Sequence, residues 1–329
     1  MITPMEYKDR YENIAVPLKG GGEKAVKVNM YRLRSMPASS YGGYNEKTMQ
    51  AFMEKLNKNG INIKLRVDTD AGTVYLDPAQ DEAEAAYKKR TGIDVSMKIE
   101  SADGTVRMDR SAGGSLPFRG ASPSKNEGAN DMHSLARYVF AGKGAPEHCQ
   151  MVLQLAHHWG LAPDPQVYAD DAMGLDCNGF IGNYLWHGKA GKSWTDLGIR
   201  NRDLGPDATI DSYFPSHPQG FVASWDDLDG SKMYVMGMVD ANGNIIRGGG
   251  GLASAGHFMI TQPNFVRPPR KNGKVSSRSI FVVESTAGHK PGLWESFYSL
   301  KNAGKNRVFT VLREEMTVQS LDVKIAEVK

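Results

Sequence analysis

Hydrophobic and polar residues alternate in two different ways along the chain. In its middle part, apolar residues recur with a helical period: one helix is expected over residues 132–141, and another from Pro146, suited to a first helical position, to a stop at Gly160. Beyond residue 230 the pattern is typical of strands. The expected strands cover residues 232–239, 256–261, 279–284, 307–312 and 321–328. Helices followed by strands predict an α+β fold.

Residues 1–110 carry a mixture of both patterns. Strands are expected over residues 24–34, 61–67 and 94–99, and helices over residues 79–90 and from a cap at Asn45 to a stop at Gly60. Residues 111–131 are rich in Gly, Pro, Ser and Asn, a composition typical of a linker. We therefore expect a smaller α+β domain of unassigned role at residues 1–110, a linker at 111–131 and a second domain at 132–329.

The composition is that of a globular protein. The 329 residues are 40% hydrophobic and 23% charged, and 40 basic against 37 acidic residues give a net charge of +3. No basic tail or Arg-rich run is present, so nucleic acid is not an expected partner, and no apolar stretch is long enough for a membrane span. Residues 1–19 carry charged side chains where a signal peptide is apolar, which predicts synthesis in the cytoplasm without a classical signal.

Cys177 is the residue with the clearest chemistry. The sequence Gly-Leu-Asp leads directly into it, and it opens an apolar-periodic segment expected to be helical to about His187. The start of a helix favours the nucleophilic thiolate, because unpaired backbone N–H groups and the helix dipole point toward it. Only one other cysteine, Cys149, is present, so a disulfide framework is not the expected reason for Cys177. Cys177 is predicted to be a catalytic nucleophile.

A thiol nucleophile needs a histidine beside it. The eight candidates are His133, His148, His157, His158, His187, His217, His257 and His289. His257 is favoured because it heads an expected strand, and Gly256 before it leaves room for another backbone or a substrate. His157 and His158 are adjacent on an expected helix and point in different directions, so we expect no metal site, and no motif indicates a cofactor.

Two stretches together resemble a known family. Residues 176–181, Asp-Cys-Asn-Gly-Phe-Ile, resemble the Asp-Cys-Ser-Gly-Phe-Val signature of the NlpC/P60 cysteine peptidases, and residues 254–260, Ser-Ala-Gly-His-Phe-Met-Ile, resemble their Gly-His-Val-Gly-Ile strand. The resemblance spans residues 146–312 and departs from the family at Asn178, where serine is usual, and in lacking a Tyr-x-Trp-Gly-Gly element. It implies a papain-like α+β domain, in which the helix with Cys177 packs on an antiparallel sheet bearing His257.

The resemblance also implies a third polar group that orients the histidine. The next expected strand nominates Glu284, and His289 in the loop after it is the alternative. The implied reaction is attack of Cys177 on an amide carbonyl, with His257 as base and then as acid. The backbone N–H of Cys177 would stabilise the oxyanion.

The substrate that the resemblance implies is the peptide part of bacterial peptidoglycan, cleaved by an amidase or endopeptidase. The missing classical signal and the extra N-terminal unit favour an exported antibacterial effector, with an immunity or secretion partner, or a phage-type lytic enzyme of the cell wall. Two alternatives stay open. One is a papain-like toxin or acyltransferase that acts on host protein or lipid, and the other is a non-catalytic binding module.

Overall fold

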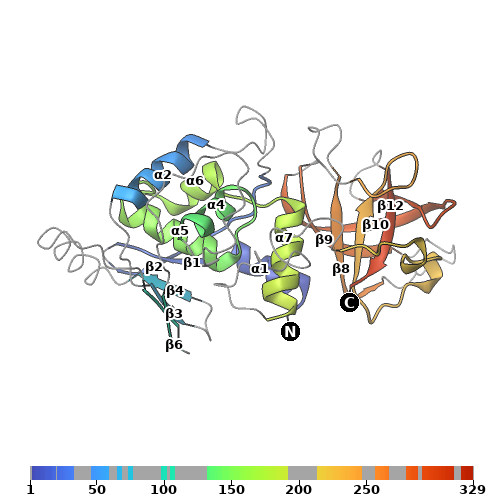
Figure 1. Cartoon of the computed structure of the whole chain (residues 1–329), viewed down its shortest axis with the longest axis horizontal. Coiled ribbons are helices and arrows are strands. Elements are labelled where there is room, and N and C mark those ends of the chain that lie inside the picture. Colours follow the sequence, from blue (N-terminus) through green and yellow to red (C-terminus); the bar gives the residue numbers. More distant parts are fainter. Residues whose placement is uncertain are drawn as a thin grey trace, which may run out of the picture.

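A computed structural model gives the fold of the chain. It describes residues 2–19, 21–32, 46–58, 65–68, 73–76, 98–101, 104–107, 132–191, 213–246, 256–266, 279–287, 291–314 and 320–328. Most helices lie on one side of the molecule and a strand barrel lies on the other, with α7 between them (Figure 1). This mixed helix-and-sheet architecture agrees with the predicted α+β class.

Six α-helices lie in the described residues. They are α1 (Pro4–Glu12), α2 (Glu46–Lys58), α4 (Met132–Phe140), α5 (Pro146–His158), α6 (Pro165–Ala172) and α7 (Cys177–Asn183), and a π-helix, η1 (Tyr184–Lys189), continues α7. The helices expected from Asn45, over 132–141 and from Pro146 are confirmed, whereas α1 and α6 were not predicted. Helix α1 is short and charged, and a capping box between Thr3 and Glu6 fixes its start. None of the described helices has the length and apolar character that crossing a membrane requires.

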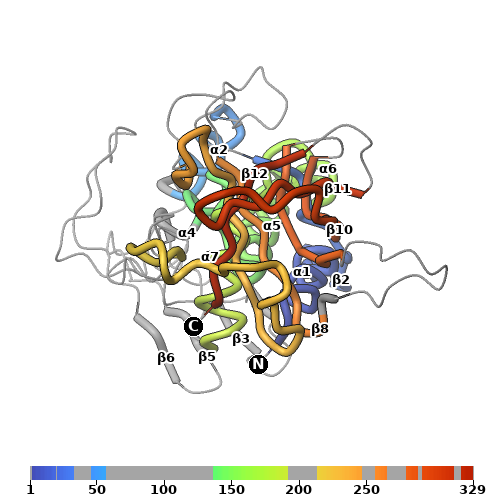
Figure 2. The backbone as a smooth tube through the Cα atoms, turned by 90° about the vertical axis from the view of Figure 1, so that its right-hand side faces the viewer, coloured from blue at the N-terminus to red at the C-terminus, as the bar shows by residue number. Residues whose placement is uncertain are grey.

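The C-terminal strands close into a six-stranded antiparallel barrel, which faces the viewer in Figure 2. Its strands are β7 (Tyr234–Met238), β8 (Phe258–Val266), β9 (Ser279–Thr286), β10 (Gly292–Ala303), β11 (Phe309–Arg313) and β12 (Ser320–Glu327), in the order β10-β11-β12-β7-β8-β9. Five of the six match expected strands, and β10 was missed.

Two smaller sheets complete the described part of the chain. One pairs β1 (Ile14–Pro17) with β2 (Glu23–Val26), and the other has the order β4 (Thr73–Leu76), β3 (Leu65–Asp68), β5 (Lys98–Ser101) and β6 (Gly104–Arg107). A strand was expected over residues 24–34, but the observed strand β2 ends at Val26. The expected helix over 79–90 lies outside the described residues.

The strand register decides which side chains face the interior of the barrel. Residues directly opposite each other in an antiparallel pair share one face. Val282 lies opposite Ser296, and Tyr298 lies opposite Arg313. Val282 and Tyr298 belong to a buried apolar cluster to which most of the barrel strands contribute. The register therefore turns Ser296 and Arg313 toward the barrel core, together with Glu284 two residues along β9 from Val282.

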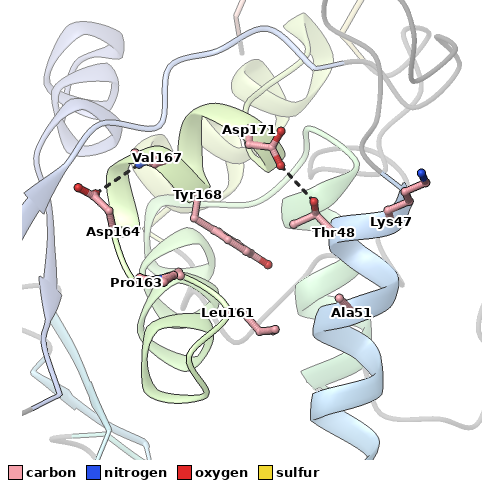
Figure 3. Close-up of a pocket in the computed structure, with 10 residues that line it drawn as sticks. Lys47, Thr48, Ala51, Leu161, Pro163, Asp164, Val167, Tyr168 and Asp171 are labelled. Atoms are coloured by element: carbon pink, nitrogen blue, oxygen red, sulfur yellow. Dashed lines mark hydrogen bonds between the residues drawn. The ribbon is translucent and has the colours of Figure 1, made fainter.

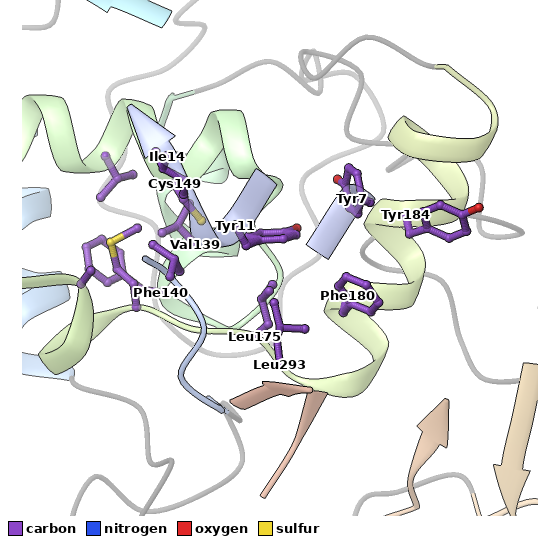
Figure 4. Packing of buried hydrophobic residues seen from close by; sticks show 14 of the residues in the cluster. Tyr7, Tyr11, Ile14, Val139, Phe140, Cys149, Leu175, Phe180, Tyr184 and Leu293 are labelled. Carbon is purple, nitrogen blue, oxygen red and sulfur yellow. The ribbon is translucent and has the colours of Figure 1, made fainter. Parts of the chain in front are cut away.

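Helix α7 packs against β8 and β9 on one side and against α1 on the other. Phe180 lies 6.2 Å from the ring of Tyr7 and 6.3 Å from that of Tyr11, ring centre to ring centre, and all three side chains are fully buried (Figure 4). On the barrel side, Ile260 and Val283 belong to the same buried cluster as Phe180. The helix that begins at Cys177 therefore packs against both α1 and the barrel.

The N-terminal elements are part of this core. Tyr7 and Tyr11 of α1 and Phe52 of α2 share one buried cluster with α5, α7 and the barrel. The backbone of the segment after β2 also contacts later parts of the chain, since Leu293 donates to the carbonyl of Asn29 at 2.9 Å. The domain boundary expected at residue 110 therefore does not separate α1 and α2 from the rest, and the linker expected at 111–131 lies outside the described residues.

Truncation of Tyr11 tests this shared core. Its ring is fully buried and its hydroxyl donates to the carbonyl of Gly144 at 2.9 Å, so Tyr11→Ala should lower the free energy of unfolding by about 3–5 kcal/mol. Met5→Ala is the matched control, because Met5 lies on the same helix and is 37% exposed. Urea denaturation measures both. An unchanged unfolding free energy for Tyr11→Ala would show that α1 does not stabilise the fold.

Candidate active site

Cys177 is the first residue of α7, as the sequence predicts. Asp176 caps the helix: its carboxylate accepts the N–H of Gly179 at 2.5 Å and lies 3.2 Å from the ammonium group of Lys143. Burial raises the pKa of the Asp176 carboxyl, although Lys143 and the helix N–H groups oppose this shift. Asp176 therefore fixes the start of the helix.

The loop that precedes Cys177 is held from two directions. Leu175 donates its N–H to the carbonyl of Met30 at 2.8 Å and accepts the N–H of Arg32 at 3.2 Å. The hydroxyl of Ser285, on β9, donates to the carbonyl of Leu175 at 2.6 Å. The N-terminal segment and the barrel thus set the position of the cysteine together.

Gly179 of the Asp-Cys-Asn-Gly stretch has a steric reason to be glycine. A Cβ atom at this position would lie 2.0 Å from the carbonyl oxygen of Gly142, well inside contact distance. This close approach brings the same carbonyl to the N–H of Asp176, at 2.9 Å. A side chain at residue 179 would push the capping residue and the cysteine out of place.

His257 lies directly before β8, and its ring contacts Glu284 on the neighbouring strand β9. The Nε2 atom of His257 is 2.5 Å from Oε2 of Glu284. The backbone at His257 is fixed because Met238 donates to its carbonyl at 3.0 Å. Gly256 allows a close backbone approach, as expected: a Cβ there would lie 2.1 Å from the carbonyl oxygen of Ile246.

The surroundings of His257 favour the charged imidazolium. Burial opposes the charge, but hydrogen bonds and charge interactions with Cys177 and Glu284 outweigh it and raise the pKa of His257 to about 10. Since Nε2 contacts Glu284, Nδ1 is the ring nitrogen that remains for the thiol. The structure thus brings Cys177, His257 and Glu284 together in one row, in the order that proton transfer from the thiol would need.

Glu284 is fully buried and surrounded by donors. Its Oε1 lies 3.0 Å from Nη2 of Arg313, and the Tyr298 hydroxyl lies 3.2–3.3 Å from both carboxylate oxygens. Burial alone would raise the pKa of this carboxyl, but His257 and then Arg313 hold it below its usual value. Glu284 is therefore an anion at neutral pH.

Two neighbours of the site were missed at the level of sequence. Arg313 directly follows the strand expected over 307–312, where a charged residue would ordinarily be exposed. Tyr31 belongs to the N-terminal segment and pairs with Leu175; burial and the nearby charges of Cys177 and Asp176 raise the pKa of its phenol. Neither residue carries a local motif that could have indicated its position. His289, the alternative to Glu284, lies outside the described residues.

Two other residues considered from the sequence, His157 and Cys149, have structural roles. The Nδ1 atom of His157 lies 2.7 Å from the carbonyl oxygen of Ala162, just beyond the end of α5. Cys149 is fully buried within α5. In the part of the chain that the structure describes, no group of three or more His, Cys, Asp or Glu side chains is arranged to hold a metal ion.

A pocket of about 570 Å³ lies away from these residues, between α2 and the segment that leads into α6 (Figure 3). The ring of Tyr168 forms part of its wall, and Thr48 donates a hydrogen bond to Asp171 across its rim at 3.1 Å. No member of the row Cys177, His257 and Glu284 lines this pocket. It was not predicted from the sequence.

Comparisons with known proteins identify no relative of the chain: no family model, no curated protein and no solved structure matches it. Support for the site therefore comes from the geometry of its residues.

The ion pair at His257 predicts a pH window for stability. A histidine with a folded-state pKa of about 10 and an ordinary value of 6.5 stabilises the fold fully below pH 6.5, and this contribution is lost as the pH rises through 10. The Glu284 contribution has the opposite sign, since its pKa is lowered: it is present above the ordinary value of 4.5 and lost only as the pH falls through the folded value.

Comparison of the wild type with His257→Asn isolates the histidine, because Glu284 stays charged above pH 6.5. The difference in unfolding free energy between the two proteins should shrink between pH 6.5 and 10 by on the order of a few kcal/mol. Urea denaturation at a series of pH values measures it. Parallel stability curves would contradict the ion pair.

Proposed function

We propose that the chain is a cysteine hydrolase in which Cys177 is the nucleophile, His257 the proton carrier and Glu284 the group that orients the histidine. The observation that carries this proposal is the buried contact of 2.5 Å between His257 and Glu284, together with the interaction of Cys177 with the same imidazole. A nucleophile, a base and an orienting group in this order are the requirement for thiol catalysis.

The mechanism begins with the proton of the thiol on His257. The raised pKa of the imidazole favours this thiolate–imidazolium pair. The Sγ atom of Cys177 attacks the carbonyl carbon of an amide, and the C–N bond then breaks as the imidazolium gives its proton to the leaving amine. A thioester remains on Cys177. His257, now neutral, takes a proton from water, which attacks the thioester and releases the acid and the thiolate.

The helix start supplies a donor for the oxyanion. Cys177 is the first residue of α7, and the first N–H groups of a helix have no partner within it. The N–H of Cys177 is close in the chain to its own Sγ, so a carbonyl attacked by the thiolate lies near this donor. The dipole of α7 adds a favourable field for the negative oxygen.

We further propose a papain-like arrangement of the NlpC/P60 type. The support is the order of elements: the helix that begins at Cys177 packs on β8 and β9 of an antiparallel barrel, His257 directly precedes β8, and Glu284 lies on β9. The motifs around Cys177 and His257 resemble that family.

From this resemblance we propose the peptide part of bacterial peptidoglycan as the substrate, which makes the chain an amidase or endopeptidase of the cell wall. An exported antibacterial effector, with an immunity or secretion partner, or a phage-type lytic enzyme would act on it in this way.

Digestion of purified sacculi tests the proposal. The wild type should release soluble muropeptides, detected by chromatography and mass spectrometry, and Cys177→Ala should lower the initial rate by on the order of 10³-fold or more. Cys149→Ala is the matched control, since it removes the second cysteine, which is fully buried in α5, and should keep the rate of the wild type.

The outcomes separate the alternatives. Release of muropeptides by Cys177→Ala at the wild-type rate would refute the nucleophile. A wild type that cleaves no sacculi but forms a covalent adduct at Cys177 with an acyl ester probe would refute the peptidoglycan substrate and favour a toxin or acyltransferase that acts on protein or lipid. A wild type that does neither would favour a binding module.

A further inference from the structure

Arg313 is a buried cation whose charge the proposed reaction does not use directly. It ends β11, is 7% exposed and faces the barrel core opposite Tyr298. Its Nη2 atom lies 3.0 Å from Oε1 of Glu284 and donates to the hydroxyl of Ser296 at 2.8 Å. Arg313 thus contacts residues on two other strands, and it reaches a different oxygen of Glu284 from the one that His257 contacts.

We propose that Arg313 is a positioning residue that gives Glu284 its own counter-ion, so that the positive charge of His257 is left to match the thiolate of Cys177. This inference rests on the proposed function of the three residues. Through Arg313, the barrel core would influence the charges of the reacting residues.

The argument begins with the cost of burying a charge. Glu284 has no exposed surface, and an ionised carboxylate without a partner in such a place is strongly destabilised. Two cations contact it, Arg313 at Oε1 and His257 at Oε2. The Tyr298 hydroxyl adds neutral hydrogen bonds only. Without Arg313, the proton on His257 would be the sole charge that balances Glu284.

The net charge of the row shows the consequence. With Arg313, the reactive state has two cations, Arg313 and protonated His257, against two anions, Glu284 and the thiolate. Without it, the same state has one excess negative charge in a buried place, which disfavours the thiolate. The excess charge is removed if the proton stays on the sulfur of Cys177 or if Glu284 becomes protonated. Each of these protonation states lowers the reactivity of Cys177 at neutral pH.

The other charged and titratable groups around Cys177 do not replace Arg313. Asp176 is a carboxyl group, which supplies no positive charge, and it pairs with Lys143. The phenol of Tyr31 stays neutral, because burial and the charges of Cys177 and Asp176 raise its pKa far above the ordinary value. Among the described residues that contact Glu284, Arg313 is therefore the cation that does not take part in proton transfer.

Alkylation of Cys177 by iodoacetamide tests the proposal without any substrate. The rate is measured from pH 5 to 10 by mass spectrometry of the peptide that contains Cys177. Burial raises the pKa of Cys149 far above its ordinary value, so this second thiol stays unreactive. Arg313→Met should move the midpoint of the rate profile upward by on the order of one pH unit, which lowers the rate near pH 6 about tenfold.

Two further variants keep the test decisive. Arg313→Lys retains the charge and should retain the wild-type midpoint, whereas the neutral variant Arg313→Gln should shift it upward. Arg10→Met is the matched control, because Arg10 is half-exposed on α1 and pairs with Glu147. The proposal is overturned if folded Arg313→Met keeps the wild-type profile. If Arg313→Met does not fold, a shift in Arg313→Lys as large as in Arg313→Gln overturns it.

The outcome of the alkylation experiment can be distinguished from that of the sacculus digestion. A shifted profile in a protein that cleaves no peptidoglycan supports the part of Arg313 and refutes only the substrate. A wild type that cleaves peptidoglycan, with an unshifted profile in Arg313→Met, refutes only the part of Arg313.

Discussion

The contact between His257 and Glu284 is the constraint on which the site depends. A carboxylate with no exposed surface needs cations, and it finds them in His257 and Arg313, on opposite sides of one carboxyl group. Because these cations come from the segment before β8 and from the end of β11, the pairing requires that β8, β9, β10 and β11 lie side by side in the barrel. The fold and the ionisation of the imidazole therefore support each other: closure buries Glu284, and the buried anion holds the proton on His257.

The cysteine reaches this pair through a second set of long-range contacts. The carbonyl of Leu175 accepts hydrogen bonds from Arg32 in the N-terminal segment and from Ser285 on β9, so the loop before α7 is held between them. Tyr7 and Phe180 then pack the helix against α1 (Figure 4). The N-terminal elements are in this way part of the frame that presents the thiol.

Local patterns in the sequence predicted much of this arrangement. Asp176 before an apolar-periodic segment placed Cys177 at a helix start, and Gly256 before a strand placed His257 near another backbone. Glu284 was nominated from a family resemblance, and the geometry brings it to the imidazole; its part in catalysis stays a prediction. These features depend on a few neighbouring residues, which is why the sequence alone could indicate them.

Other features depend on contacts that no local pattern carries. Arg313 is the last residue of the short strand β11, and only the pairing of β11 with β10, and of β10 with β9, turns it toward Glu284. Strand β10 was missed because its alternation is irregular around Trp294 and Glu295. The packing of α1 on later elements has the same cause: Tyr7 and Tyr11 contact Phe180, which lies more than a hundred residues away in the chain.

The most direct test of the central claim is to trap the acyl-enzyme. Wild-type protein is mixed with muropeptides or an acyl ester probe and quenched in acid, which preserves a thioester, and its peptides are mapped by mass spectrometry. The account predicts an acyl adduct on the peptide that contains Cys177, absent from Cys177→Ala. Substrate turnover without an adduct at Cys177, or with an adduct on another residue, would contradict it.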